Sequence, residues 1–512
     1  GYPVLLKPSA GGGGKGMRVV RRVQDLPEAI AGARREARGA FGNGTLLVER
    51  FIATARHIEI QVLADAHGAA VHLGERECSL QRRHQKIVEE APSVLLDAAT
   101  RARMGQCAVA VAKAVGYTGA GTVEFIMPAD TPDQFFFLEM NTRLQVEHPV
   151  TELVTGLDLV AYQLRVAAGE PLGLRQDDVA AAGHAVQARI YAEDPANGFL
   201  PTGGPVLQLG EPAGPGVRVD SGLRVGDTVG SDYDPLLAKV IAHGPDRDTA
   251  LRRLDAALAQ TSILGLRTNV GFLRGLLADA DVQAGRLDTG LVERRKPPSA
   301  QLPEHVLAAA ALRALLALEP AGPVVDPFAL PGGWRIGEAA WTRWRVQASS
   351  YEPVEVRTRG RSARAELVVG EGPPTLASAR WDDADLVVTL DQITRRYTCA
   401  ADGAAVWLGR GGHSWELHEQ QPLDAPPRSA PGGGGAVRTP MPGTIVAVDV
   451  AEGQHVTAGA RLLVLEAMKM EHVLTAPIDG VVRELRARPG GTVERGAVLV
   501  VVDPVSGDES YS

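Results

Sequence analysis

The feature that most restricts the fold of this chain is an internal repeat near its C-terminal end. Eight residues of one segment return 37 positions later in the same order: Pro440, Gly443, Gly453, Val456, Gly459, Ala460, Leu462 and Val464 return as Pro477, Gly480, Gly490, Val493, Gly496, Ala497, Leu499 and Val501. Each half is too short to bury a core alone. We therefore expect two similar four-stranded halves that close on each other with pseudo-twofold symmetry.

A lysine lies between the two halves, in the sequence Ala467-Met468-Lys469-Met470, which has no counterpart in the repeat. This position predicts a hairpin tip held away from the core. Residues 422–435, rich in proline and then in glycine, precede the repeat and predict a tether. A small module on a tether with a lysine at its tip is typical of a carrier, and a solvated turn lysine is the alternative.

Composition excludes several classes of protein. Apolar residues make up 45% of the 512 and charged residues 22%, which is typical of globular domains, and this length predicts three or four of them. The net charge of -8, without a long basic run, argues against nucleic acid or an anionic membrane as partner. No stretch approaches the roughly 18–20 apolar residues of a membrane span. Three widely spaced cysteines favour a reducing cytoplasm.

The order of periodic segments predicts a multidomain α/β (α+β) chain. Residues 1–296 alternate β-rich runs, such as 45–49, 57–64 and 122–127, with helical stretches at 98–115 and 247–259. A helix at 304–318, followed by short alternating strands from about 334 to 417, predicts a helix with an antiparallel sheet or barrel. A β-type run at residue 1 leads us to expect a first domain that is incomplete. The expected units are 1–51, 52–296, 297–421, the linker 422–435, and 436–505.

A glycine-rich loop follows the first strand and reads Lys-Pro-Ser-Ala-Gly-Gly-Gly-Gly-Lys-Gly from Lys7 to Gly16. Successive glycines let backbone N–H groups approach phosphate oxygens, and the two lysines would neutralise charge. The loop lacks the Lys-Ser/Thr ending of the Walker motif. It predicts a phosphate-binding loop, with a simple flexible turn as the alternative.

Two acidic strands predict a metal site. If residues 122–127 and 135–141 form a symmetric hairpin, Glu124 faces Glu139, and Asn141 shares the face of Glu139. Opposed carboxylates destabilise a ladder unless a cation compensates, and these oxygen ligands are typical of Mg²⁺ or Mn²⁺. A solvated acidic face is the alternative.

Polar residues continue this pattern downstream. If the chain stays extended after Asn141, then Arg143, Gln145 and Glu147 lie on the same side as the metal ligands, where they could orient an anion and remove its proton. Residues 78–86 and 184–194 are two further dense polar runs. Together they predict a second wall of one site.

These motifs resemble the ATP-grasp biotin carboxylase component in the glycine-rich loop, residues 81–86, Glu124, 139–148 and 189–194. Residues 467–470 resemble the biotin attachment site of biotin carboxyl carrier domains. The order of the motifs resembles the α subunit of biotin-dependent acyl-CoA carboxylases, most closely the 3-methylcrotonyl-CoA type. The resemblance implies a partial ATP-grasp carboxylase without its N-terminal lobe: a lid at 1–51, the C-terminal carboxylase domain at 52–296, a helix-plus-barrel subunit-docking domain at 297–421, and a flattened-barrel biotinyl domain at 436–505.

The resemblance also implies a role for each matching residue. ATP would be bound by Lys7, Gly11, Gly12, Gly13, Gly14, Gly16, Glu49, Ile52, His57, Gln81 and His84. Magnesium or manganese would be held by Glu124, Glu139 and Asn141, and bicarbonate by Lys86, Arg143, Gln145 and the backbone of Val146. Glu147 would deprotonate bicarbonate, Arg143 and Arg189 would stabilise the biotin enolate, and Lys469 would carry biotin. Gln187 departs from the glutamate usual in this family two residues before Arg189.

A hetero-oligomer is implied as well. A carboxyltransferase β subunit would pass the carboxyl group to an acyl-CoA, with 3-methylcrotonyl-CoA favoured and acetyl- or propionyl-CoA as alternatives. Biotin protein ligase would attach the biotin. Two further hypotheses remain open, a truncated biotin carrier without carboxylase activity and a lipoyl-type carrier.

Overall fold

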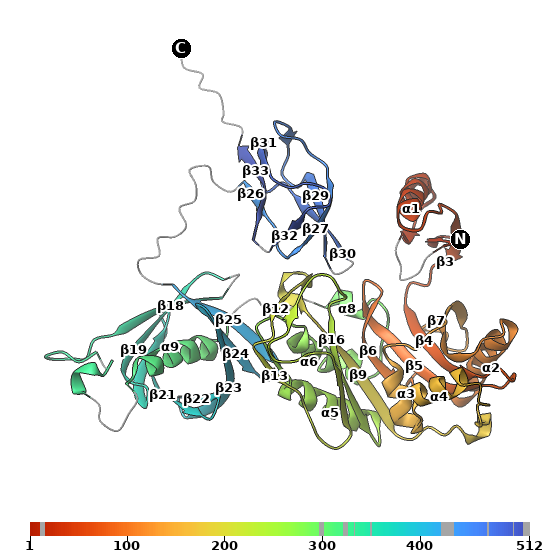
Figure 1. The fold of residues 1–512 in the computed structure, drawn as a ribbon, viewed down its shortest axis with the longest axis horizontal. Coiled ribbons are helices and arrows are strands. Elements are labelled where there is room, and N and C mark those ends of the chain that lie inside the picture. Colours follow the sequence, from red (N-terminus) through yellow and green to blue (C-terminus); the bar gives the residue numbers. More distant parts are fainter. Residues whose placement is uncertain are drawn as a thin grey trace, which may run out of the picture.

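The computed structural model describes the chain except residues 11–15, 296–301, 321–325, 332, 349–350, 421–434, 468–469, 495 and 505–512. Four units follow one another along the described part (Figure 1). The expected linker at 422–435 lies almost entirely outside it. None of the helices in the described ranges is long and apolar enough to cross a membrane.

The first unit, which we call the lid, is a small antiparallel sheet with one helix on it. The sheet has the order β2-β1-β3, with β1 (Val4–Pro8), β2 (Arg18–Val20) and β3 (Leu46–Arg50), and the helix is α1 (Leu26–Phe41). Gly42 ends α1 with a left-handed φ of 69°, a conformation that glycine adopts without a Cβ clash. Figure 1 shows the lid standing above one end of the large sheet.

The second unit, which we call the sheet body, is built on an eight-stranded antiparallel sheet. Its order is β14-β16-β9-β6-β5-β4-β7-β8. The strands are β4 (Ala55–Ala64), β5 (Ala70–Arg82), β6 (Gln85–Ala91), β7 (Gly119–Pro128), β8 (Phe136–Asn141), β9 (His184–Tyr191), β14 (Val217–Ser221) and β16 (Leu236–Gly244).

Seven α-helices accompany this sheet in the described residues: α2 (Ala98–Ala114), α3 (His148–Thr155), α4 (Leu159–Ala167), α5 (Arg247–Gln260), α6 (Val270–Leu277), α7 (Ala280–Gln283) and α8 (Leu291–Arg294). Short strands complete the unit: β10 (Glu193–Asp194), β11 (Leu200–Pro201), β12 (Gly204–Pro205), β13 (Gln208–Gly210), β15 (Thr228–Val229) and β17 (Ser262–Leu264). The predicted helices at 98–115 and 247–259 are confirmed as α2 and α5.

Strand alternation separates the two faces of the large sheet. Ile58, Ile60 and Val62 of β4 pack in one core with residues of α2, and alternate residues of β9 pack in a second core with α5. Because successive side chains point to opposite faces, the residues between them, such as Glu59 and Arg189, lie on the other face. Helix α3 covers that face, where Thr151 accepts a hydrogen bond from Arg76. The polar face is therefore enclosed, and it holds the site described below.

The third unit is a closed eight-stranded barrel packed around one helix. The helix α9 (Glu304–Leu318) has the predicted bounds, and seven of its 15 residues are buried in the core of the barrel. The strands are β18 (Thr342–Ala348), β19 (Val354–Arg361), β20 (Arg364–Val369), β21 (Thr375–Asp382), β22 (Asp385–Leu390), β23 (Ile393–Asp402), β24 (Ala405–Arg410) and β25 (His413–Glu419). The first strand thus begins at Thr342, later than the predicted start near residue 334.

The fourth unit, the carrier module, confirms the repeat. One sheet has the order β26-β33-β31-β28 and the other β30-β29-β27-β32. The first half holds β26 (Ala436–Arg438), β27 (Gly443–Val448), β28 (His455–Val456) and β29 (Arg461–Ala467); the second half holds β30 (Met470–Thr475), β31 (Gly480–Leu485), β32 (Thr492–Val493) and β33 (Val498–Pro504). Each sheet takes two strands from each half, and one shared core lies between the sheets.

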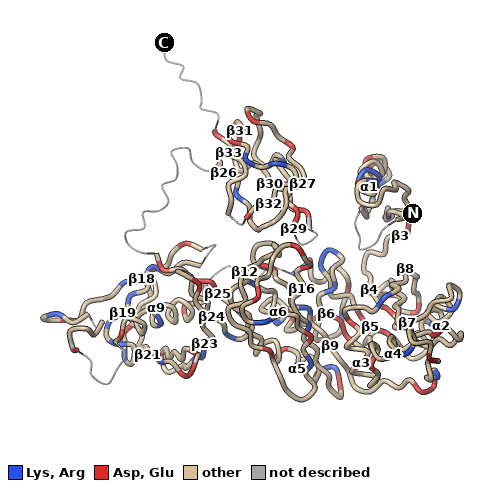
Figure 2. The backbone as a smooth tube through the Cα atoms, viewed as in Figure 1, with Lys and Arg blue, Asp and Glu red and all other residues tan. Residues whose placement is uncertain are grey.

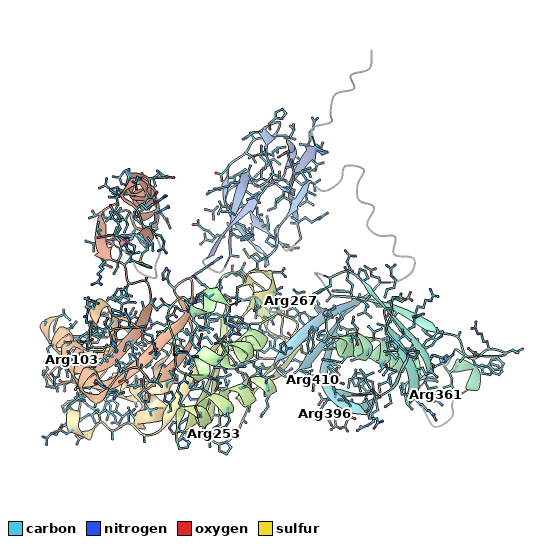
Figure 3. All side chains as sticks on the ribbon, turned by 180° about the vertical axis from the view of Figure 1, so that it is seen from behind. Arg103, Arg253, Arg267, Arg361, Arg396 and Arg410 are labelled. Carbon is cyan, nitrogen blue, oxygen red and sulfur yellow. The ribbon has the colours of Figure 1, made fainter. Side chains whose placement is uncertain are left out.

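The barrel is fastened to the sheet body by polar contacts. Arg267, labelled in Figure 3 at the junction of the two units, pairs with Asp194 of the body and with Glu416 of β25, the second at 3.6 Å. Arg274 of α6 donates to the carbonyl oxygen of Gly411 at 2.7 Å. A cavity of about 150 Å³ between the units is lined by both. These contacts fix the barrel beside the end of the sheet.

The burial of α9 gives a first prediction. Leu312 is 0% exposed in the barrel core, whereas Leu318 on the same helix is 56% exposed. Replacing Leu312→Ala removes buried methyl groups and leaves a cavity, so it should lower the free energy of unfolding of the barrel by about 2–5 kcal/mol. All six tryptophans lie between residues 334 and 415, so urea unfolding followed by tryptophan fluorescence reports on this unit. Leu318→Ala is the matched control and should change little; equal effects of the two would contradict the packing described.

Candidate active site

The hairpin of β7 and β8 has the predicted register. Glu124 is paired directly with Glu139, and Thr122 with Asn141, so Asn141 shares a face with the two carboxylates. The Asn141 Nδ2 atom donates to Glu124 Oε1 at 2.8 Å. The pairing register of the two strands shifts between Glu124 and Phe125, on the side of the turn, and this shift leaves the Glu124–Glu139 pair intact. Two opposed carboxylates and an amide are thus brought to one place.

This donor set fits a hard divalent cation. Glu124 and Glu139 offer carboxylate oxygens and Asn141 offers its side-chain Oδ1 atom. Mg²⁺ and Mn²⁺ prefer such oxygen ligands. A second group of ligand-type atoms, from His57, Glu59 and Glu124, lies within 4.8 Å of one another. Lys86 donates to both of these glutamates, and its ammonium group would repel a cation there. The side of Glu124 that faces Glu139 is therefore the better cation site.

Lys86 of β6 is the centre of the buried charges. Its Nζ atom contacts three carboxylates, those of Glu59 at 2.5 Å, Glu124 at 2.9 Å and Glu147 at 2.7 Å, and its side chain is 11% exposed. Burial disfavours the ammonium, but these carboxylates outweigh it and raise the pKa of Lys86 well above its usual value. Lys86 is therefore a permanent cation that joins three strands and the start of α3.

Glu147 is fully buried between two cations. Lys86 Nζ donates to Oε1, and Arg189 Nη2 donates to Oε2 at 3.0 Å. Burial alone would raise the pKa of Glu147, but Lys86 and Arg189 outweigh it and hold this pKa far below its usual value. On the opposite side of Lys86, the His57 hydrogen bond and Lys86 together overcome burial and lower the pKa of Glu124 to about 2. Both glutamates are ionised at neutral pH.

The segment after Asn141 is not extended, contrary to the sequence-based expectation. β8 ends at Asn141, and a turn leads into α3, with Glu147 as its N-cap residue and Pro149 in its first turn. Proline is well tolerated there because its missing N–H would have no partner. The turn brings Glu147 back under the sheet, so Glu147 reaches Lys86 through helix geometry and not through strand alternation.

The same turn holds the residues Arg143, Gln145 and Val146, which the resemblance assigns to bicarbonate. Arg143 Nη1 donates to Gln145 Oε1 at 3.1 Å, and the carbonyl oxygen of Val146 accepts from Lys239 Nζ at 3.0 Å. The Nε2 atom of Gln145 is buried and has no hydrogen-bond partner among the described residues. A buried amide donor without a partner is costly, so this nitrogen is available to an incoming acceptor.

The residues assigned to the nucleotide are distributed over two units. Lys7 and Glu49 lie on the lid, with Lys7 Nζ 3.7 Å from Glu49. Gly16 follows on the lid with a left-handed φ of 79°, whereas Gly11, Gly12, Gly13 and Gly14 fall outside the described residues. Gln81 is paired with Lys86 in the ladder, His84 lies in the β5–β6 turn, His57 contacts Glu124, and Ile52 lies in the connection from the lid.

Four charged residues of this site escaped the sequence analysis: Glu59, Arg76, Glu89 and Lys239. Arg76 is 0% exposed and donates to Glu59 at 2.5 Å, which holds Glu59 against Lys86. Glu89 accepts from Arg189 Nε at 2.5 Å. Two features of the sequence point to these residues. Polar residues alternate with apolar ones along 57–61, which predicts one polar face of a strand, and lysine is scarce, which marks Lys239 as well as Lys86.

Lys469 itself lies outside the described residues. Its neighbours are described, and Ala467 of β29 pairs with Met470 of β30, so Met468 and Lys469 join these two strands at the boundary of the two halves. Figure 2 shows acidic residues of the carrier module next to this junction, and Glu466 and Glu471 are paired there.

Four family models match the chain in sequence. They are described as Carbamoyl-phosphate synthase L chain, ATP binding domain, at residues 1–175; Biotin carboxylase C-terminal domain at 187–294; Methylcrotonyl-CoA carboxylase, alpha-subunit, BT domain at 303–422; and Biotin-requiring enzyme at 435–502.

Curated relatives match over nearly the full chain. The methylcrotonoyl-CoA carboxylase subunit alpha of Mus musculus is 39% identical over 99% of this chain and 73% of its own length. The propionyl-CoA carboxylase alpha chain of Ruegeria pomeroyi is 40% identical over 98% of this chain and 77% of its own length. The chain belongs to the family of biotin-dependent acyl-CoA carboxylase α subunits. Biotin, ATP and magnesium are the cofactors expected for this family.

Solved structures agree with this family. The biotin carboxylase domain of the Hydrogenobacter thermophilus 2-oxoglutarate carboxylase, in complex with MgADP, ADP and bicarbonate, is 45% identical with a TM-score of 0.56. The match covers 57% of this chain and 64% of the Hydrogenobacter chain, just under two thirds. The Campylobacter jejuni biotin carboxylase, in complex with a nucleotide, is 43% identical with a TM-score of 0.56. The match covers 58% of this chain and 65% of the Campylobacter chain.

The position of Lys86 gives a second prediction. Lys86→Met leaves three buried carboxylates without their shared cation, which should cost about 3–5 kcal/mol of stability. Their pKa values then rise above those of the unfolded chain, so the folded state binds extra protons and its stability falls as pH rises. Thermal unfolding followed by circular dichroism should therefore show a larger loss at about pH 8 than at about pH 5. Lys113→Met, at an exposed position of α2, is the control; a loss independent of pH would contradict the arrangement.

Proposed function

We propose that this chain is the biotin-carboxylating α subunit of an acyl-CoA carboxylase, in which ATP and bicarbonate carboxylate biotin carried on Lys469. The observation that carries the proposal is the buried carboxylate of Glu147, held between Lys86 and Arg189 two residues after Gln145, whose Nε2 atom has no hydrogen-bond partner in the described part of the chain. This combination offers a proton acceptor and anion-binding donors in one enclosed place.

Bicarbonate would bind to the groups around this turn. Lys86 and Arg143 supply positive charge, the Gln145 amide supplies the buried donor, and the backbone of Val146 completes the wall. A bidentate guanidinium and an amide suit a planar, three-oxygen anion. Glu147 lies in contact with Lys86, so an anion held by Lys86 is placed next to this carboxylate.

Glu147 would take the bicarbonate proton so that an oxygen can attack the γ-phosphate of ATP. Its low pKa makes it a weak base while both cations contact it. An anion that draws Lys86 toward itself removes part of this stabilisation and raises the basicity of Glu147. The general base is thus strengthened when its substrate is bound.

The attack would give carboxyphosphate and ADP, and the carboxyphosphate would break down to CO₂ and phosphate. The phosphate would take the proton of the biotin ring nitrogen, which then bonds to CO₂, and Arg189 and Arg143 would stabilise the negative charge that develops on biotin. The Arg189 guanidinium is buried and fixed by Glu89 and Glu147, so it needs little reorganisation at this step, and Arg143 would act from the exposed side of the turn. Lys7 and the glycine-rich loop of the lid would hold the ATP phosphates. Magnesium bound by Glu124, Glu139 and Asn141 would supply charge neutralisation at the phosphates.

A carboxyltransferase β subunit would complete the reaction. The matching BT domain of methylcrotonyl-CoA carboxylase alpha subunits and the Mus musculus relative favour 3-methylcrotonyl-CoA as acceptor. Propionyl-CoA is the second candidate, because propionyl-CoA carboxylase alpha chains are about as similar to this chain. Biotin protein ligase would modify Lys469. A cytoplasmic location stays a prediction, since several relatives are named mitochondrial.

A surface of the barrel unit suits the β subunit. Phe328, Trp334 and Ile336 precede the first barrel strand and are 89%, 79% and 96% exposed. Large apolar side chains this exposed, close together in sequence, are typical of an interface. We place the β-subunit contact on this segment.

The base assignment gives a third prediction. Glu147→Gln removes the proton acceptor but keeps the shape of the side chain, so bicarbonate-dependent ATP cleavage should fall by roughly 10²–10⁴-fold. ATP binding, measured by calorimetry, should be unchanged. Glu170→Gln, at an exposed position, is the control. Full activity of Glu147→Gln would exclude Glu147 as the base.

The intact mass of the purified chain tests the carrier part of the same proposal. A biotin adduct that is absent in Lys469→Arg supports it, whereas a lipoyl adduct would replace it with the lipoyl-carrier hypothesis. A biotin adduct together with no bicarbonate-dependent ATP cleavage would favour the hypothesis of a carrier without carboxylase activity.

The docking surface gives a fourth prediction. The double variant Trp334→Asp, Ile336→Asp should abolish co-purification with the β subunit, because two charges replace the apolar contact, and should leave biotinylation of Lys469 intact. Leu376→Asp changes a side chain that is 62% exposed on a barrel strand and serves as the control. Retained binding by the double variant would move the interface elsewhere.

A further inference from the structure

Two carbonyl groups of the turn between β8 and α3 are held by side chains. The carbonyl oxygen of Gln145 accepts from the Nδ1 atom of His148 at 2.7 Å. The carbonyl oxygen of Val146 accepts from the Nζ atom of Lys239 at 3.0 Å, and this is the hydrogen bond found for it in the described part of the chain. The orientation of the backbone at Val146 therefore depends on a lysine from another strand.

Holding these carbonyl groups also fixes the direction of two N–H groups. In a planar trans peptide the carbonyl oxygen and the N–H point in opposite directions. The carbonyl of Gln145 shares its peptide unit with the N–H of Val146, and the carbonyl of Val146 shares its unit with the N–H of Glu147. Neither N–H has a hydrogen-bond partner among the described residues. Two backbone donors are thus aimed and still available to a ligand.

The large sheet places Lys239 beside this turn. Lys239 of β16 is paired with Arg189 of β9 on one side and with Asp220 of β14 on the other. Paired residues share one face of a sheet, so Lys239 lies on the same enclosed polar face as Arg189. Its side chain is 13% exposed, and its Nζ atom is 2.9 Å from Asp220 Oδ2. The ammonium group therefore has two fixed partners, a carboxylate and the Val146 carbonyl.

Asp220 anchors Lys239 to the rest of the polar face. Burial alone would raise the pKa of Asp220, but hydrogen bonds from Arg218 and Lys239 outweigh it and lower this pKa, so the carboxylate is ionised at neutral pH. Arg218 in turn donates to Glu152 of α3 at 2.7 Å. The ammonium that holds the turn is therefore tied, through Asp220 and Arg218, to the helix that the turn begins.

We infer that Lys239 is a positioning residue of the bicarbonate site, which holds the Val146 carbonyl and thereby keeps the N–H groups of the turn in the orientation that an anion requires. The inference rests on the proposed function for the identity of that anion. Donors that are fixed before the ligand arrives need no ordering when it binds, which increases affinity. Lys239 acts through the backbone, so its removal should weaken the binding of bicarbonate and leave that of ATP unchanged.

The deciding variant is Lys239→Met, which removes the ammonium and keeps a long unbranched side chain. KM for bicarbonate should rise at least about tenfold, because the Val146 carbonyl loses a charged donor and the turn loses its orientation. KM for ATP should stay within about twofold. Lys113→Met, at an exposed position of α2, is the matched control and should change neither constant. An unchanged KM for bicarbonate, or an equal rise of both constants, would overturn the inference.

Asp220→Asn separates positioning from simple attraction of the anion. This variant keeps Lys239 and removes a negative charge, so attraction alone predicts an unchanged or lower KM for bicarbonate. If Lys239 positions the turn, the loss of its ionised partner should instead raise this KM by about threefold or more. The two explanations thus predict opposite signs, and a fall in KM would overturn the inference.

Binding without turnover distinguishes this inference from the proposed function. With MgADP present, bicarbonate should raise the melting temperature of the unmodified chain relative to chloride at equal pH and ionic strength, and this rise should be largely lost in Lys239→Met. A rise in the unmodified chain without bicarbonate-dependent ATP cleavage would count against the proposed function alone, since the comparison with Lys239→Met still decides the role of Lys239. No rise in the unmodified chain would overturn the inference together with the bicarbonate assignment.

Discussion

One buried ammonium group organises the centre of this protein. Lys86 holds Glu59, Glu124 and Glu147 at contact distance, and these carboxylates come from β4, from β7 and from the start of α3. Three negative charges cannot be buried together without a shared cation, so the ladder positions of β4, β6 and β7 and the placement of α3 depend on this contact. Arg76 and Arg189 extend the same compensation to either side. The chemistry proposed for the site uses charges that the fold already requires.

The sheet separates two tasks by strand alternation. On β4, the apolar residues Ile58 and Ile60 pack against α2, while Glu59 between them faces the enclosed polar side. The same division occurs on β9, where Ala188 is in a core and Arg189 is in the site. Stability and reactivity therefore rest on alternate residues of the same strands. This explains why a face so rich in charge can exist inside a stable domain.

The parts that sequence reasoning predicted are those whose spacing is local. The pairing of Glu124 with Glu139 follows from one short hairpin, and the carrier strands follow from a fixed repeat, so both could be counted along the chain. Glu89 could not be found in this way, because its partner Arg189 lies on a strand joined by a long connection whose register depends on the whole sheet. Glu59 and Arg76 face each other in the short β4–β5 hairpin, so counting could have found this pair, but its link to Lys86 on the next strand also depends on the register of the sheet. The turn at Glu147 was missed because strand alternation was carried past Asn141, where Pro149 and the N-cap already signal a helix.

The exchange of strands in the carrier module has a consequence for its folding. Each repeat has one ladder of its own, β27–β29 in the first and β31–β33 in the second, but its remaining strands pair only with strands of the other repeat, so neither repeat can complete its sheets while the other is unfolded. Partly melted forms of the module have little to stabilise them, and it should gain or lose structure in a single step. Because the two repeats gain and lose structure together, the module keeps its core closed for as long as it is folded.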